Sequence, residues 1–170
     1  LVEAARRGAT GEADAEATLR EGLALVRKAQ ALVVGPDLAG PGSAVPVNLA
    51  CSVSRYAYEL GDLTGALAEL DRADRHLAAG AVVGVPSRVE CQLYRSYIEL
   101  GQGQFERALT TTREAMQALE ASGTRTGEQH RIMRSALARA LLSVGRTAEA
   151  LAIADPLLAE SDAGQGRQSM

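Results

Sequence analysis

YIELGQGQFERALTTTREAMQAL, residues 97–119, repeats the pattern of YAYELGDLTGALAELDRADRHL, residues 56–77. In both stretches an Ala-Leu pair is followed, seven residues after its alanine, by a second alanine. The pair occurs four times in steps of 42 residues, at Ala24, Ala66, Ala108 and Ala150. Fixed periods of about 20 to 50 residues are typical of stacked helical repeats. The sequence therefore predicts a repeat protein.

Each repeat is expected to contain two helices. Apolar residues recur at helical spacing from Leu63 to Leu77, and runs of β-branched or aromatic residues, which are typical of strands, are nearly absent. The predicted fold is all-α, a right-handed solenoid of stacked antiparallel helix hairpins with about seven to eight helices. Its expected parts are a long N-terminal helix or degenerate first repeat (1–34), a Gly/Pro-rich linker (35–46), three hairpins (47–161) and a flexible tail (162–170).

Composition and charge restrict the classes of function. Aromatic residues make up 3% of the chain and the net charge is −3, which favours a core of Ala, Leu and Val and argues against direct nucleic-acid binding. No apolar run reaches the roughly 18 residues of a membrane span. The sequence shows no phosphate-binding loop and no ligands at metal-site spacing, so we expect no cofactor, no metal and no enzyme activity.

The cysteines and the basic residues bear on the origin of the chain. Cys51 and Cys91 fall on separate predicted helices, and we expect unpaired packing residues in a reducing compartment such as the cytoplasm. Lys28 is the only lysine among 18 basic residues, a bias that points to a GC-rich, actinobacterium-like genome. The chain starts with Leu1 rather than Met, so we expect it to be part of a longer protein.

The repeat resembles the tetratricopeptide repeat, which has a glycine between its two helices and two alanines in the second helix. The matching residues are Gly61, Ala66 and Ala73, then Gly103, Phe105, Ala108 and Ala115, then Gly145 and Ala150. The likeness covers about residues 46 to 160, with a period like that of kinesin light chains and large bacterial regulators. It implies a scaffold that binds a protein or an acidic peptide in a concave groove.

In tetratricopeptide repeats the first helix of each hairpin lines this groove. We aligned these helices on Gly61, Gly101 and Gly145, which gives the middle copy two extra residues in its turn. An arginine then stands six residues before each glycine, at Arg55, Arg95 and Arg139. The resemblance implies that these three arginines line the groove together with Tyr58, Glu59, Glu99, Asn48 and Arg88.

Two interpretations of the three arginines remain open. Either they donate to carboxylates of an acidic peptide, or they form a solvated face in which Arg55 pairs with Glu59 and Arg95 with Glu99 at i,i+4 spacing. Arg139 has a serine at that offset and is therefore the arginine most available to a ligand.

The expected function is a non-catalytic protein- or peptide-binding module of a larger cytoplasmic bacterial signalling or transcription regulator. The alternative is a structural segment that self-associates as a homodimer, or that packs on a neighbouring domain and holds it inactive.

Overall fold

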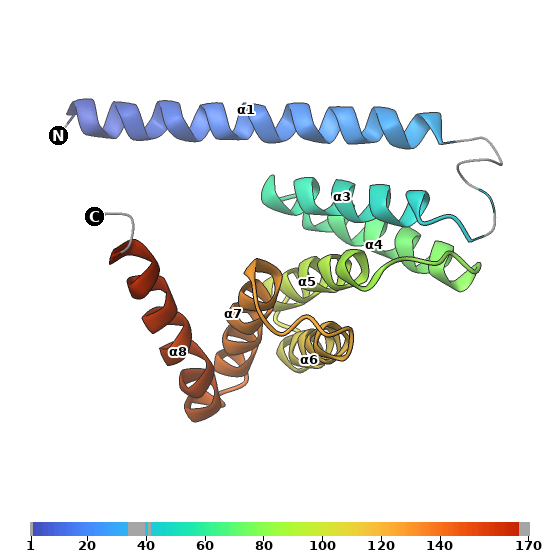
Figure 1. Ribbon diagram of the computed structural model, residues 1–170. Helices are drawn as coiled ribbons and strands as arrows, with labels where there is room; N and C mark the ends of the chain where they lie inside the picture. The colour runs from blue at the N-terminus through green and yellow to red at the C-terminus, as the bar shows by residue number, and fades with distance from the viewer. Residues whose placement is uncertain (1, 34–39, 41, 167–170) are drawn as a thin grey trace. The chain divides into compact units, whose positions relative to one another are not determined.

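The computed structural model describes residues 2–33, 40 and 42–166, and within these ranges the chain forms seven α-helices and no strand (Figure 1). The prediction of an all-α fold is confirmed. No helix in these ranges is long and apolar enough to cross a membrane. The helices belong to two compact units, residues 1–83 and 84–170, and each unit is described by itself.

The first unit contains α1 (Val2–Leu32), α3 (Val45–Glu59) and α4 (Leu63–Ala78). α3 and α4 form a hairpin, and α1 packs against α3 (Figure 1). At the start of α4, the Asp62 carboxylate accepts a hydrogen bond from the backbone N–H of Gly65 at 2.8 Å and caps the helix. The interior of the hairpin consists of small and medium-sized apolar residues, namely Val47, Ala50, Val53, Ala57, Ala66, Leu70 and Ala73.

The second unit contains α5 (Val85–Gly101), α6 (Phe105–Ala121), α7 (Glu128–Ser143) and α8 (Thr147–Gly166). α5 pairs with α6 and α7 pairs with α8, while α7 also packs against α6 and so connects the two hairpins. Two buried clusters form the core. They contain Val89, Ala115, Met116, Leu119 and Met133 in one case, and Leu109, Ala140, Leu141 and Ala150 in the other.

A glycine with positive φ follows the first helix of each hairpin. The φ angle is 81° at Gly61, 74° at Gly103 and 78° at Gly145. In each case the N–H groups of the glycine and of the next residue donate to carbonyls of the last helical turn, as in a Schellman motif. The three glycines are 42 residues apart, so the helix ends follow the period of the sequence.

These glycines correct the alignment of the middle copy on Gly101. Gly101 is the last residue of α5, and Gly103 is the residue with positive φ that corresponds to the terminating glycines of the other hairpins. The middle copy therefore has no extra residues in this turn. Six residues before Gly103 stands Tyr97 rather than Arg95.

The alanines of the repeat lie where paired helices pack closely. Ala66 and Ala108 are 0% exposed, and Ala150 is 1% exposed, because only a small side chain fits at these positions. Their burial follows the 42-residue period of the sequence. Ala24 of α1 is exposed instead, so the first copy of the pattern is not used in the same way.

The ends of two predicted segments differ from the structure. α3 begins at Val45, inside the expected linker, of which residues 35–39 and 41 lie outside the described residues. α8 continues through Pro156 to Gly166, because a proline removes one backbone hydrogen bond without necessarily ending a helix. Residues 162–166 are therefore helical where the sequence predicts a flexible tail, and residues 167–170 lie outside the description.

The expectation about the cysteines is wrong. Neither Cys51 nor Cys91 is free. A reducing compartment is expected because the thiols are expected to be unpaired. Since neither thiol is free, that expectation is no longer supported.

Candidate functional site

A groove lies between α7 and α8 of the second unit, with a volume of about 450 Å³. Helix α7 contributes residues spaced by three or four positions, which places them on one helix face. The α7 residues are Arg131, Ser135, Ala138, Arg139 and Leu142, and the α8 residues are Ala154, Leu157 and Leu158. The groove is therefore apolar apart from two arginines and one serine.

Two of the leucines that line the groove are unusually exposed for apolar residues. Leu142 is 53% exposed and Leu158 is 64% exposed, whereas Ala138 between the helices is 6% exposed. Apolar clefts that contain a few polar groups are the usual form of a ligand site. The leucines offer apolar contact area, and Ala138 leaves space between the two helices.

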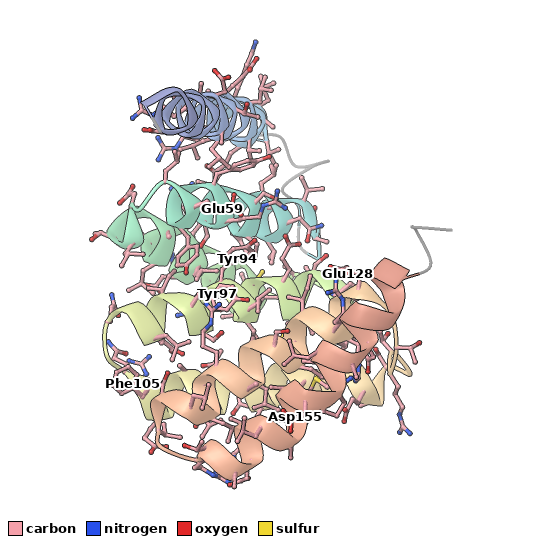
Figure 2. The ribbon with its side chains drawn as sticks, turned by 90° about the vertical axis from the view of Figure 1, so that its left-hand side faces the viewer. Glu59, Tyr94, Tyr97, Phe105, Glu128 and Asp155 are labelled. Atoms are coloured by element: carbon pink, nitrogen blue, oxygen red, sulfur yellow. The ribbon has the colours of Figure 1, made fainter. Side chains whose placement is uncertain are left out.

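Arg139 is the cation of this groove that is most available to a ligand. Its Cζ lies 5.3 Å from the ring centroid of Tyr97 on α5. Tyr97 meets Tyr94 edge to face, with 6.1 Å between the ring centroids. Figure 2 labels both tyrosines. A guanidinium stacked on a ring keeps the N–H donors in its plane free for hydrogen bonds. Within the described residues no carboxylate forms an ion pair with Arg139. Ser143 donates its hydroxyl hydrogen to the backbone carbonyl of Arg139 at 3.0 Å, not to its side chain.

The other arginine of the groove is already neutralised. Arg131 pairs with Glu128, and this hydrogen bond raises the pKa of Arg131. A second cavity of about 420 Å³ contains this pair and a 2.9 Å pair between Arg134 Nη1 and Glu160 Oε1. Arg134 also lines a third cavity of about 410 Å³. Arg139 thus differs from Arg131 and Arg134, because it has no ion-pair partner in the described part of the chain.

Arg55 is half-buried and forms the i,i+4 ion pair with Glu59 that one of the two interpretations predicts. On α3 its Nε lies 3.6 Å from Glu59 Oε1, and its Cζ lies 5.2 Å from the ring centroid of Tyr56. Tyr58 is half-buried, and Asn48 is exposed near the start of the same helix. These residues belong to the first unit and are not part of the α7–α8 groove.

Glu99 connects two helices and is not part of the α7–α8 groove. It is 3% exposed, accepts a hydrogen bond from Thr111 Oγ1 at 2.9 Å and lies 3.5 Å from Nη2 of Arg107. The predicted i,i+4 partner Arg95 is half-buried on α5, and Arg88 is exposed near the start of that helix. Neither arginine lines the α7–α8 groove.

The corrected register explains these positions. Counted back from the glycine with positive φ, Glu99 corresponds to Ala57 and Leu141, which are 1% and 2% exposed. Arg95 corresponds to Val53, which is 0% exposed. Both positions lie on the side of the helix that is buried within the hairpins, which is why they do not line an open surface.

The sequence interpretation missed Tyr97 and the leucines of α8. Tyr97 stands six residues before Gly103, as Arg55 and Arg139 stand before their own glycines, so alignment on Gly103 would have found it. Leu157 stands at the position of the second alanine of the repeat, seven residues after Ala150. No repeat signal identifies Leu158, because its exposure depends on how α8 packs against α7.

In comparisons with known proteins, no family model, no curated protein and no solved structure matches this chain. No group of three or more His, Cys, Asp or Glu side chains in the described ranges could hold a metal ion.

Proposed function

We propose that the chain is a non-catalytic, tetratricopeptide-like binding module and that its second unit binds a peptide in the α7–α8 groove. The observation that carries this proposal is Arg139, which is exposed, stacked on Tyr97 and placed in an apolar groove without a carboxylate partner among the described residues. The repeated hairpins with terminating glycines support the solenoid arrangement that the period predicts. The larger bacterial regulator stays a prediction of the sequence, whereas the cytoplasmic location no longer has the support of unpaired cysteines.

The groove favours a peptide that combines an acidic and an apolar side chain. A carboxylate can accept two parallel hydrogen bonds from the edge of the Arg139 guanidinium, and the Tyr97 ring already holds this group in place. Pre-organisation lowers the entropy lost when a long side chain is fixed on binding. An apolar side chain of the same peptide would pack against Leu142 and Leu158, whose exposed surface would leave water.

The size of the groove limits what it can bind. Ligand pockets of drug-sized molecules have volumes of about 300 to 1,000 Å³, and the 450 Å³ found here is in the lower part of that range. This volume suits one or two anchoring side chains of a peptide. We expect a short linear motif to bind with modest affinity, since the groove contacts only one or two of its side chains.

The proposal is tested by selecting binders from a displayed library of random 12-residue peptides against the whole chain. Selected peptides should share Asp or Glu next to Leu, Ile or Phe. Arg139→Ala should weaken a selected peptide by about 10- to 100-fold, the effect of losing a hydrogen-bonded charged group. Leu142→Arg should weaken it as well, because it places a charge in the apolar groove. Raised salt should reduce the effect of the arginine substitution.

Arg88→Ala is the matched control, since Arg88 is an exposed arginine of the same unit outside the groove. It should leave peptide affinity unchanged. Arg139→Ala should shift the unfolding midpoint only slightly, because an exposed cation–π contact contributes about 0.5 to 1 kcal/mol. The proposal would be refuted if the selected peptides bound Arg139→Ala and Leu142→Arg as tightly as they bind the unchanged chain.

A further inference from the structure

The repeat pattern predicts a buried helix face on α1 that the structure leaves open. Ala24 and Ala31 are the counterparts, 42 residues earlier, of Ala66 and Ala73 in α4. In α4 these alanines are 0% and 1% exposed because they pack within the hairpin. In α1 both are exposed.

α1 uses its opposite face to pack against α3. The half-buried positions of α1 recur at helical spacing around Gly22, where the Tyr56 ring of α3 approaches the helix backbone. At 100° per residue, Gly22 and Val26 lie on the side of the helix opposite Ala24 and Ala31. The alanine face is thus turned away from α3.

The open face has apolar edges and a row of charged residues along its centre. Ala17, Ala24 and Ala31 lie along one edge, and Leu25 and Leu32, which are 63% and 69% exposed, lie along the other. Asp14, Glu21 and Lys28 lie between these edges at seven-residue intervals, and all three are exposed. Of these, Glu21 and Lys28 are the adjacent pair of opposite charge. Exposed apolar stripes of this kind mark interaction surfaces, and the alanines allow a second helix to approach closely.

We propose that this face of α1 pairs with the same face of a second copy of the chain in antiparallel orientation. Glu21 and Lys28 are equally distant from the midpoint between Ala24 and Leu25. A two-fold axis through that midpoint places Glu21 of each helix opposite Lys28 of the partner subunit, so two ion pairs form. A parallel pair would place Glu21 opposite the partner's Glu21, and Lys28 opposite the partner's Lys28. Charge complementarity therefore selects a second copy in the antiparallel arrangement.

The same axis brings Leu25 next to the partner's Leu25 and Ala24 next to the partner's Ala24. Each leucine loses exposed apolar surface, and the alanines let the helices approach to within the 8 to 10 Å typical of packed helices. The face is short, so the dimer is reversible and depends on protein concentration. This contact is independent of the peptide groove, which lies in the other unit.

A zero-length carbodiimide crosslinker provides a direct test, because Lys28 is the only lysine of the chain. At concentrations where sedimentation detects a dimer, we expect a crosslinked species of twice the chain mass that contains a bond between Lys28 of one copy and Glu21 of the other. An intramolecular bond is not expected, since the two residues lie roughly 10 Å apart along one helix.

Charge substitutions test the orientation. Glu21→Lys or Lys28→Glu alone replaces both ion pairs with like-charge contacts and should weaken dimerisation by about 10-fold or more. The double variant E21K/K28E re-creates the two pairs in reverse and should restore the dimer. Glu114→Lys, the same charge change at an exposed position of α6, is the control and should have no effect. A chain that stays monomeric at millimolar concentration, or a double variant as weak as the single variants, would overturn the proposal.

Discussion

Gly22 of α1 should resist replacement by alanine, although alanine is the better helix former. An ideal Cβ at this position would lie 2.6 Å from Cε1 and 2.8 Å from Cζ of Tyr56, so the ring would have to move by 0.8 Å to reach an ordinary contact of 3.4 Å. Gly→Ala in a helix gains about 1 kcal/mol, whereas overpacking costs about 1 to 3 kcal/mol. We expect Gly22→Ala to lower the free energy of unfolding by up to about 2 kcal/mol.

Gly11 provides a matched control on the same helix. Nothing lies within 4 Å of a Cβ added there, so Gly11→Ala should gain the helix propensity without steric cost. The difference between the two variants, about 1 to 3 kcal/mol in urea unfolding followed by circular dichroism, isolates the contact with Tyr56. With Tyr56→Ala as background, both alanine substitutions should be equally favourable. If Gly22→Ala stabilises the wild-type chain as much as Gly11→Ala does, the packing of α1 on α3 is not as described.

Two further predictions concern the second unit. Ala108→Leu should lower stability by about 1 to 3 kcal/mol because Ala108 is 0% exposed, and an unchanged melting temperature would contradict close packing there. Glu99→Ala should lower stability by about 1 to 3 kcal/mol because it removes the buried acceptor of the half-buried Thr111 hydroxyl. Glu99→Gln keeps an acceptor and should cost clearly less, so equal losses in urea unfolding would show that this hydrogen bond is unimportant.

Much of the fold could be predicted from the sequence because its determinants are local. A positive φ requires glycine far more often than any other residue, and a close helix crossing requires a small side chain. Gly61 and Ala66 meet these two requirements in one hairpin, and their counterparts 42 residues later meet them again. In the three hairpins, the ends of the first helices and the buried alanines of the second helices therefore follow the period.

The candidate site was predicted less well because it depends on a choice between neighbouring glycines. Gly101 and Gly103 both follow an apolar helix end, and only one of them takes the positive φ. A shift of two residues rotates a position by about 200° around a helix. The alignment on Gly101 therefore assigns Arg95, which lies on the hairpin side of α5, to the position that Tyr97 occupies. Tyr97 is the residue that contacts Arg139.

α1 shows a second limit of the period. The same alanine pattern is buried in α4 and exposed in α1, since a pattern can mark a face suited to helix packing but cannot supply the partner helix. In the first unit α1 packs on α3 with its Gly22 side rather than its alanine side. Glycine has no side chain, so the Tyr56 ring can reach the helix backbone there. The alanine side is then left with Leu25 and Leu32 in solvent. Such exposure has an energetic cost unless another helix covers it, and the symmetric placement of Glu21 and Lys28 suits a second α1 as that helix.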